Sequence, residues 1–513
     1  MRGIIENNGA LVFSPDPIDS VSPGVTYARV LTLRHNGDAN GTLIATCDLT
    51  TLFDGHQVWP VFRSTDHGAT WERISNMWDS TTGFTRQMNP FLFEMPQQMG
   101  DFEEGTLLLA GNLKPDDEST TNIMIFYSTD MGITWTHLST VDSGGPAVYD
   151  KSPESTTTAV WEPYLAVSAN GHLVCYYSDE RQKDKGILQA QVQRISTDAG
   201  RTWGELQNVV GIPNRSDRPG MITMATMPNG VRLATYEVVN RPSVEVDGAP
   251  VYFKTSPDGV TWDSEDLGTP ILLEDGRGIG SSPYVIWVDD STENGMVVVG
   301  SKWALDENGH LMQGQNFFVN RNLGEGYWER LPMAVVFDSI DDNALLTGLS
   351  MSMETDITNK VIYQAVNVQN DETDLNDLRI GAIPVHFTDY EAENADLTNV
   401  NIVNHYDASN EQKVGGINYD DSSVVFNNIE VVTSGDYAIL IRYDNGSGVK
   451  CTQKITINDE ESQEVVFPQT KDWGRFGWVV IVAYLKAGTN KVAFSYWDGY
   501  TEIDCIWVRF QDL

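Results

Sequence analysis

Basic residues, long apolar runs and helical periodicity are all scarce in this chain of 513 residues. Its 33 lysines and arginines face 72 acidic residues, and the resulting net charge of −39 repels nucleic-acid phosphates and anionic lipids. No stretch approaches the ~20 apolar residues that span a bilayer. The sequence therefore predicts no nucleic-acid partner and no membrane partner, whereas a neutral polymer is compatible with its charge.

Cysteine is also rare, and its spacing excludes the usual zinc sites. The chain has Cys47, Cys175, Cys451 and Cys505, whose spacing fits no zinc pattern. We expect Cys47 and Cys175 to be buried thiols, because both lie in apolar strands. A disulfide between Cys451 and Cys505 is left open. The first residues lack the apolar core of a signal peptide, so any export signal is expected to have been removed or never to have existed.

A turn-forming phrase, Ser-x-Asp-x-Gly-x-Thr-Trp, is repeated along the first half of the chain. Full copies begin at Ser64, Ser128 and Ser196, and a copy one residue shorter begins at Ser256. Aspartate and serine side chains hydrogen-bond nearby backbone in turns, and glycine tolerates a positive φ. A repeat of roughly 60 to 70 residues predicts stacked copies of one supersecondary unit. The phrase resembles the Asp-box of sialidase-like β-propellers, which is architectural and does not indicate catalysis.

A second repeated element lies between these turns: a short apolar strand that opens with a polar residue and usually a proline. Clear copies cover 89–92, 162–165, 218–221 and 282–285, and weaker ones cover 27–30 and 347–350. Each is followed by a turn and a second apolar strand, which is a hairpin signal. Six such units predict a six-bladed β-propeller over residues 1–386, closed by a strand from residues 2–14.

The repeats stop near Pro384, and residues 387–513 have a different pattern. Strands are expected at 423–432, 435–443, 450–457, 478–485, 491–496 and 505–510, without the turn phrase. Short strands in a segment of this length favour a separate β-sandwich of the jelly-roll type. The predicted fold class is therefore all-β, a six-bladed propeller followed by a sandwich.

Propeller ligands bind where the inner strands begin, so residues before the repeat prolines should ring that mouth. A second ring is expected from the following strands, at Asp48, Asn112, Ser178, Glu237, Lys302 and Val366. Glu162 and Glu237 stand out, because glycoside hydrolysis needs two carboxyls, about 5–5.5 Å apart for retention or about 6.5–9.5 Å for inversion. The apolar strand around Glu237 should raise the pKa of that residue and suit it to general acid catalysis. In the structural alternative, Glu162 caps a strand and Glu237 pairs with Arg218 or Lys302.

Residues 15–385 resemble the family 93 glycoside hydrolases, exo-acting α-1,5-L-arabinanases on a six-bladed propeller. The resemblance is carried by the stretches 87–92, 160–165, 218–221, 235–237 and 280–285. It implies Glu162 and Glu237 as the catalytic pair, without a cofactor, releasing arabinobiose from the non-reducing end of linear arabinan with retention. Which glutamate is the nucleophile stays open. Substrate contacts are expected from Tyr27, Arg29, Asn89, Trp161, Arg218, Ser282 and Tyr284.

Three other functions are compatible with the same scaffold. A sialidase needs three arginines for the sialate carboxylate, and Arg29, Arg218 and Arg232 form no obvious triad because Arg232 falls in the middle of a strand. Another exo-glycosidase would share the glutamate pair. A non-catalytic sugar-binding adhesin would not need that pair.

Residues 390–510 resemble carbohydrate-binding modules of families 35 and 6. The resemblance is carried by Tyr390-Glu391-Ala392-Glu393, by 414–416, by 435–443 and by 503–506. It implies a structural calcium held by Glu391, Glu393 and Asp504. Sugar contacts are expected from Tyr419, Trp473, Trp497, Asp498 and Tyr500, and core packing is the alternative for the aromatic residues. The whole chain is expected to be a secreted monomer that acts on arabinan in plant cell walls.

Overall fold

The computed structural model describes residues 4–6, 9–214, 216–240, 249–340 and 346–510. These residues are almost all in strands and loops, with three short 3-10 helices, η1 (Gly37–Ala39), η2 (Lys183–Lys185) and η3 (Ala392–Asn394). Two compact units are formed: Ala10–Glu329 with Phe337–Ile380, and Met1–Gly9 with Arg330–Val336 and Gly381–Leu513. Within the described ranges, no helix is long and apolar enough to cross a membrane.

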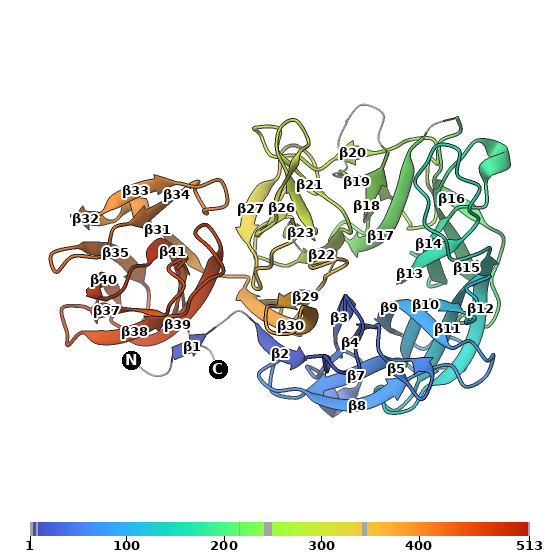
Figure 1. Ribbon diagram of the computed structural model, residues 1–513, viewed down its shortest axis with the longest axis horizontal. Coiled ribbons are helices and arrows are strands. Elements are labelled where there is room, and N and C mark those ends of the chain that lie inside the picture. The colour runs from blue at the N-terminus through green and yellow to red at the C-terminus, as the bar shows by residue number, and fades with distance from the viewer. Residues whose placement is uncertain (1–3, 7–8, 215, 241–248, 341–345, 511–513) are drawn as a thin grey trace. The chain divides into compact units, whose positions relative to one another are not determined.

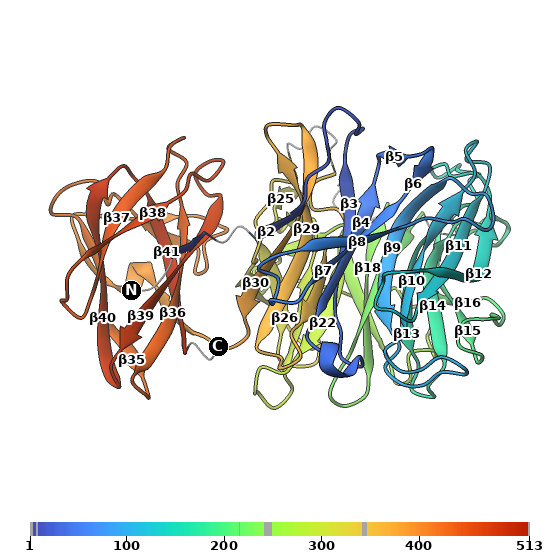
Figure 2. The same ribbon diagram turned by 90° about the horizontal axis from the view of Figure 1, so that it is seen from below.

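The larger unit is a six-bladed β-propeller, as predicted. Each blade is a four-stranded sheet. The innermost strands of blades 1 to 6 are, in order, β3 (Val25–Thr32), β9 (Arg86–Glu94), β13 (Val160–Val167), β17 (Arg218–Thr226), β22 (Tyr284–Val288) and β28 (Ser352–Thr355). Each inner strand contacts the next and β28 contacts β3, so the six surround a central channel (Figures 1 and 2). We call the end where these strands begin the entry mouth, and the other end the opposite mouth.

The remaining strands follow outward from the channel. The second strands are β4 (Leu43–Leu49), β10 (Leu107–Lys114), β14 (Leu173–Asp179), β18 (Arg232–Val239), β23 (Met296–Gly300) and β29 (Val361–Asn370). The third strands are β7 (Trp59–Ser64), β11 (Thr121–Ser128), β15 (Ala190–Ser196), β19 (Val251–Ser256), β26 (Asn316–Asn320) and β30 (Leu375–Pro384). The outer strands are β8 (Glu72–Met77), β12 (Thr136–Gly144), β16 (Gln207–Val210), β20 (Thr269–Pro270), β27 (Glu329–Pro332) and β2 (Ala10–Phe13).

Two small sheets supplement the blades, and the last blade is built from both ends of the propeller. The small sheets are β5 (Leu52–Phe53) with β6 (His56–Gln57), and β21 (Gly278–Gly280) with β24 (Trp303–Leu305) and β25 (Leu311–Gln313). In blade 6, β2 pairs with β30 in antiparallel fashion. The predicted closing strand is therefore confirmed for residues 10–13, whereas residues 4–6 pair elsewhere.

The repeated turn phrase has the expected local chemistry. In the first copy, Asp66 Oδ1 accepts the Thr70 amide at 2.9 Å and Ser64 Oγ accepts the Gly68 amide at 2.9 Å. Trp71 Nε1 donates to the Gly68 carbonyl at 3.1 Å, and Gly68 has φ +88°. In the degenerate fifth copy, Asn320 Oδ1 takes the place of the serine and accepts the Asn322 and Gly324 amides, both at 2.8 Å. The phrase closes the turn between the third and fourth strands.

Apolar faces of neighbouring blades pack against each other between the sheets. Trp59 of blade 1 is fully buried with Leu107 and Leu109 of blade 2. Gly111 allows this approach, because a β-carbon there would lie 2.2 Å from the Trp59 ring. Burial of this kind fixes the angle at which consecutive inner strands meet the channel.

The smaller unit is a β-sandwich, as predicted. One sheet contains β1 (Ile4–Glu6), β39 (Phe476–Leu485), β36 (Gly435–Asp444), β41 (Glu502–Phe510), β34 (Gln412–Gly415) and β33 (Asn401–Asn404), with β31 (Thr388–Glu391) also paired to β41. The other contains β32 (Asp396–Thr398), β35 (Ser423–Val431), β40 (Gly488–Asp498), β37 (Cys451–Ile457) and β38 (Gln463–Phe467). Apolar residues of both sheets, such as Ile441 and Phe494, form one core.

The structure rules out the disulfide that the sequence left open. Cys451 and Cys505 are both buried free thiols, as are Cys47 and Cys175. Cys451 lies on β37 and Cys505 on β41, in different sheets of the sandwich. The Cys451 thiol instead lies 2.9 Å from the Tyr500 carbonyl oxygen, and the Cys505 thiol lies 3.9 Å from Asp504 Oδ2.

Candidate active site

The inner strands share a strained backbone feature at the entry mouth. Each blade has at least one non-glycine residue with a positive φ at or near the start of its inner strand: Tyr27 (49°), Asn89 (58°), Glu162 (60°), Met221 (56°), Ser282 (44°) and Ser350 (56°). In blade 5, Ser281 (63°) shares this conformation with Ser282. In blades 1 to 4 the pairing with the second strand shifts at this point, as at a β-bulge. Such strain persists only where surrounding contacts enforce it, and it gathers at functional sites.

Side chains on the second strands hold several of these residues in place. Asp48 Oδ2 accepts the Asn89 amide at 2.9 Å, and Asn112 Oδ1 accepts the Glu162 amide at 2.8 Å. Glu237 Oε2 accepts the Ser282 amide at 2.7 Å. Each acceptor belongs to the blade before the residue that it braces. The second ring predicted from the sequence therefore includes these three residues at equivalent positions.

Glu162 lies in a dense set of polar contacts. Its Oε1 accepts the Tyr27 hydroxyl at 3.2 Å, and its Oε2 accepts the Ser178 hydroxyl at 3.0 Å and the Met221 amide at 3.2 Å. Burial, and then the negative charge of Glu237, raises the pKa of Glu162 to about 7, against the opposing effect of these hydrogen bonds. Glu162 can therefore change protonation state near neutral pH.

Glu237 approaches the same segment of backbone from blade 4. It pairs across the sheet with Gly220, and a β-carbon on Gly220 would lie 3.5 Å from Glu237 Oε1. The next residue, Met221, donates its amide to Glu162. Burial raises the pKa of Glu237, while the Ser282 amide, the Ser281 side chain and the charge of Arg218 lower it. The two carboxyls thus converge on residues 220–221 at the entry mouth.

A small cavity and several unsatisfied polar atoms lie at this mouth. The cavity is lined by Tyr27, Arg29, Asn89, Glu162, Thr223 and Ser350, among others. Three buried atoms here have no hydrogen-bond partner among the described residues: Asn89 Oδ1, Trp161 Nε1 and Ser282 Oγ. Because buried polar atoms are nearly always paired in folded proteins, these three indicate places for a polar ligand. Three of the predicted substrate contacts thus offer free hydrogen-bonding groups.

Arg29 and Arg218, also predicted to contact substrate, direct their terminal guanidinium nitrogens to protein acceptors, although the Nε of each is buried with no hydrogen-bond partner among the described residues. Arg218 is fully buried, and its Nη2 binds Glu180 Oε1 at 2.6 Å and Gln189 Oε1 at 2.8 Å. Arg29 donates to the Ser350 carbonyl at 2.6 Å and lies 5.5 Å from the Tyr27 ring centre. In blade 4 the strained position is Met221, three residues beyond Arg218. Met221, and not Arg218 as the repeat predicted, is therefore equivalent to Asn89 and Glu162. Arg218 is held by the protein at the start of β17 and affects Glu237 through its charge.

Tyr284 lies deeper in the channel than the sequence suggested. It lines a second cavity of about 410 Å³ with Arg34, Arg232 and Glu354, at the ends of the inner strands. Phe91 and Tyr164 line both cavities and separate them. The Arg29 guanidinium lies 5.9 Å from the Tyr284 ring centre. Tyr284 therefore belongs to the middle of the channel, toward the opposite mouth.

Comparison with known proteins places the propeller in a family. The profile of the BNR repeat-like domain matches residues 31–293, half of the chain. This chain belongs to the BNR repeat-like domain family. Its BNR propeller is similar to the α-L-arabinanase of Penicillium chrysogenum solved with arabinobiose, at 29% identity and a TM-score of 0.62 over 75% of this chain and 99% of the other.

Two further proteins are similar to the chain. The family 93 α-L-arabinofuranosidase of Fusarium graminearum, also solved with arabinobiose, is 26% identical with a TM-score of 0.62, over 74% of this chain and 98% of the other. A 1,6-α-glucosyltransferase of Sporosarcina globispora is 27% identical over 143 residues, 26% of this chain. The match spans only 11% of that relative's length.

Tyr149 is a residue at the entry mouth of the BNR propeller that sequence reasoning missed. It lies on the loop 145–159 between blades 2 and 3, and 65% of its surface is exposed. The Arg218 guanidinium lies over its ring, 5.5 Å from the ring centre. Burial, and then the negative charge of Glu237, raises the pKa of Tyr149. An aromatic residue in a loop that otherwise lacks repeat features was the available signal.

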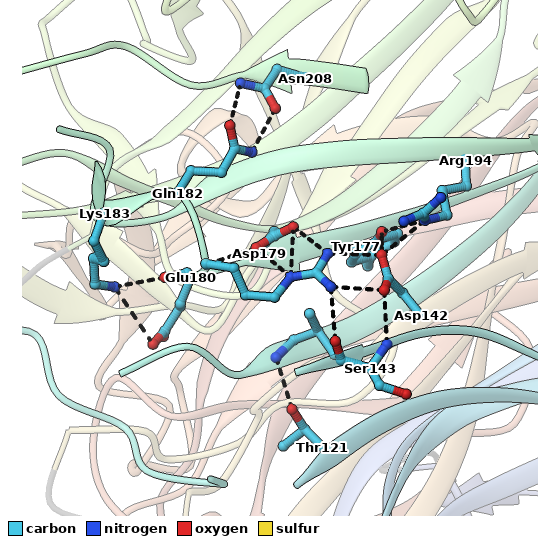
Figure 3. Close-up of polar contacts among 12 residues, drawn as sticks. Thr121, Asp142, Ser143, Tyr177, Asp179, Glu180, Gln182, Lys183, Arg194 and Asn208 are labelled. Carbon is cyan, nitrogen blue, oxygen red and sulfur yellow. Dashed lines mark hydrogen bonds and ion pairs between the residues drawn. The ribbon is translucent and has the colours of Figure 1, made fainter. Parts of the chain in front are cut away.

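A charged network supports blade 3, which carries Glu162. Asp142 accepts Arg181 Nη1 and Nη2, both at 2.7 Å, Arg194 Nε at 2.8 Å and the Tyr177 hydroxyl at 2.5 Å (Figure 3). Arg181 also bonds Asp179 at 2.7 Å. Burial opposes ionisation of Asp142, but these hydrogen bonds outweigh it and hold the pKa below its ordinary value. The network ties β12 to β14 and β15.

We expect Asp142→Asn to lower the free energy of unfolding by about 2–4 kcal/mol at pH 7, because two guanidinium groups lose a charged partner. The pKa of Asp142 is lower in the folded state, so its contribution is present above its unfolded pKa and disappears as pH falls through the folded value. Urea unfolding at neutral and acidic pH measures this. The exposed Asp184→Asn is the control and should change stability by less than about 0.5 kcal/mol. An equal effect of Asp142→Asn at all pH values would contradict the electrostatic explanation.

Acidic residues gather in the sandwich, where the sequence predicted calcium ligands. Ser409 hydrogen-bonds to two of them. Its hydroxyl donates to Glu391 Oε2 at 2.6 Å, and its amide donates to Asp504 Oδ1 at 3.0 Å. Asp504 is also paired with the fully buried Arg442 at 2.7 Å. Glu393 Oε1 accepts Asn410 Nδ2 at 2.8 Å, while Glu393 Oε2 is buried with no hydrogen-bond partner among the described residues.

Asp389 joins this cluster, although the sequence did not single it out. Ligand atoms of Asp389, Glu391 and Cys505 lie within 4.8 Å of one another. Burial, followed by the charge of Asp389, raises the pKa of Glu391 to about 8, and burial, followed by the charge of Asp504, raises that of Asp389 to about 6. Carboxylate oxygens under mutual repulsion are suitable ligands for a hard divalent cation. The residues fit calcium, with Asp389 available and Asp504 already neutralised by Arg442.

The predicted sugar-binding aromatics of the sandwich are largely exposed. Tyr419, Trp473 and Trp497 are 59%, 39% and 46% exposed. Trp473 and Tyr500 meet edge to face with ring centres 4.9 Å apart, and Tyr500 donates to Glu502 at 2.7 Å. Asp498 is exposed beside Trp497 at the end of β40. The structure therefore brings Trp473 and Tyr500 together, with both partly accessible.

Proposed function

We propose that this protein is an exo-acting glycoside hydrolase that releases arabinobiose from the non-reducing end of linear α-1,5-L-arabinan, with retention of configuration. Glu162 and Glu237 act as the nucleophile and the acid/base catalyst. The observation that carries the proposal is their convergence on residues 220–221 from adjacent blades, beside unsatisfied polar groups. Similarity to two arabinan- or arabinofuranoside-hydrolysing enzymes solved with arabinobiose supports the substrate class.

The arginines favour this activity over a sialidase. Sialate recognition needs several free guanidinium groups around one carboxylate. Here Arg218 is buried against Glu180, Arg29 donates to Ser350, and Arg232 lines the opposite cavity. These three arginines are therefore not available together at the entry mouth, and a neutral substrate fits the charge of the chain better.

Product analysis on linear arabinan tests the proposed function. We expect a disaccharide as the first and only early product, because an exo-acting site on a narrow channel accepts a chain end. Release of another sugar from a different polymer would indicate a different exo-glycosidase. Binding to arabinan without any release would favour the non-catalytic adhesin.

The pH dependence of hydrolysis should report the coupled glutamates. The active form carries one proton on the pair, because the nucleophile must be ionised and the acid protonated. The pKa of Glu162 is raised to about 7, so loss of the one proton of the active form should reduce kcat/KM above about pH 7. Protonation of both glutamates should reduce kcat/KM under acidic conditions. A bell-shaped profile of kcat/KM between pH 4 and 9 is the expected measurement. A profile that stays flat through pH 7 would contradict this assignment.

We also propose that the sandwich binds calcium through Asp389, Glu391 and Glu393. The ion would neutralise carboxylates whose burial and mutual repulsion raise the pKa of Glu391, and it would satisfy Glu393 Oε2, which has no hydrogen-bond partner among the described residues. Calcium at about 100 times its Kd should raise the free energy of unfolding by about 2.7 kcal/mol. Thermal unfolding with calcium, magnesium or chelator measures this effect.

A matched pair of variants separates a specific site from general charge effects. Glu391→Gln should abolish the calcium-dependent rise in Tm, whereas the exposed Glu460→Gln should keep it. A rise of the same size in both variants would contradict the assignment.

A further inference from the structure

We propose that Tyr149 forms a sugar-binding subsite outside the glutamate pair, which takes the part of a neutral polysaccharide chain on the leaving-group side of the scissile bond. This inference rests on the proposed function. No sequence motif pointed to it, because the residue lies on a loop between repeats.

The register of blade 4 places Tyr149 outward from the glutamates. Glu237 lies opposite Gly220, and Arg218 is two residues closer to the entry mouth on the same strand. A strand rises about 3.3 Å per residue, so Arg218 stands about 6–7 Å outward from the level of Glu237. The Tyr149 ring covers the Arg218 guanidinium, with 5.5 Å between the guanidinium carbon and the ring centre.

The cavity beside Glu162 lies in the other direction from the glutamates. It extends along the inner strands to Tyr164 and Thr223, and Tyr164 also lines the second cavity, which contains Tyr284. A chain end that fills this cavity leaves the rest of the polymer to emerge past Arg218. Tyr149 is an exposed aromatic residue beside Arg218 on that path.

One ring face of Tyr149 packs on Arg218, and the residue as a whole is 65% exposed. An open aromatic face next to solvent suits the apolar C–H face of a sugar, whereas a phosphate or carboxylate is disfavoured by the net charge of −39. Arg218 is already neutralised by Glu180 and does not attract an anion. The chemistry therefore selects a neutral sugar ring.

The loop that carries Tyr149 is held in place before any ligand arrives. Arg218 Nη1 donates to the Asp150 carbonyl at 3.1 Å, and Gly145 donates its amide to the Thr158 carbonyl at 2.8 Å. The Asp150 carboxylate accepts the Ser152 amide at 2.9 Å. Asn240 Nδ2 donates to the Lys151 carbonyl. A platform fixed in this way binds without a large ordering cost.

The test compares two substrates that differ only on the leaving-group side. Linear arabinan places a sugar ring on Tyr149, whereas arabinobiosyl fluoride has no ring beyond the scissile bond. Tyr149→Ala should lower kcat/KM for arabinan about tenfold and leave the value for the fluoride within about twofold. Tyr149→Phe should retain the wild-type value for both, because it keeps the ring. Val148→Ala, an exposed neighbour on the same loop, is the matched control and should change neither.

Each outcome has a definite meaning. An equal loss on both substrates, or no loss on arabinan, overturns the subsite while the proposed function stands. If the wild-type protein turns over neither substrate, the proposed function is overturned and the subsite with it. Unchanged Tm for Tyr149→Ala is expected, since Arg218 keeps its contacts with Glu180, Gln189 and Asp150.

Discussion

Glu162→Gln and Glu237→Gln are each expected to lower kcat for arabinan hydrolysis by at least about 10³-fold, with Tm little changed. Glutamine keeps the size of the side chain but can neither attack the anomeric carbon as a carboxylate nor deliver a proton. Because the two carboxyls meet at residues 220–221, loss of either should disable the same reaction. Initial rates of arabinobiose release, with thermal unfolding alongside, measure the effect. Full activity in either variant would remove the proposed mechanism.

Azide distinguishes the roles of the two residues. In an alanine variant of the acid/base residue, azide attacks the glycosyl-enzyme and gives an azide product with retained configuration. In an alanine variant of the nucleophile, azide takes the place of the carboxylate and gives the inverted product. The configuration of the product therefore assigns Glu162 and Glu237 separately, which neither sequence nor geometry does. Asp184→Ala, on the surface of η2, is the control and should show no response to azide.

Arg218→Met is expected to lower the free energy of unfolding by about 3–5 kcal/mol, the second large effect. Arg218 and Glu180 are both essentially inaccessible, at 1% and 0% side-chain exposure, with 2.6 Å between charged atoms. Removing the arginine leaves a buried carboxylate that Lys183, at 4.0 Å, compensates only in part. Urea unfolding measures the loss.

Two further variants make this result interpretable. The double variant Arg218→Met with Glu180→Leu should recover most of the stability, because no uncompensated charge remains. The exposed pair Arg201–Asp101, at 48% and 90% exposure, is the matched contrast, and Arg201→Met should cost less than about 1 kcal/mol. A small loss for Arg218→Met would show that water reaches Glu180 and that the pair is not structurally important.

The fold could be predicted because its signals are local. The turn phrase fixes short-range hydrogen bonds, as Asp66 and Ser64 show, and alternating strands follow from it at a regular interval. Asn320 shows that the turn tolerates a substitution that still supplies an oxygen acceptor. Residues 4–6 illustrate the limit, because nothing in their sequence distinguishes pairing with β30 from their actual pairing with β39.

The candidate site was predictable only in part. Asn89, Glu162 and Ser282 precede prolines and lie at the strained positions, so the repeat located them. In blade 4 the strained position is two residues after the proline, and the same reasoning selected Arg218 in place of Met221. The repeat also does not predict the direction of a side chain, since Tyr284 lines the second cavity and not the one beside Glu162. Asp389 is recognisable only through neighbours that are distant in sequence, such as Cys505.

The pairing of β1 with β39 has a practical consequence for dissecting the protein. A fragment that begins at residue 387 would keep β36 but lack β1, the other partner of β39, and one edge of that mostly apolar strand would present unpaired backbone. Exposed edge strands pair with strands of other chains, so the isolated fragment should self-associate. Fusing residues 1–9 back to it through a flexible tether would restore the missing neighbour and is the better starting point for studying the sandwich alone.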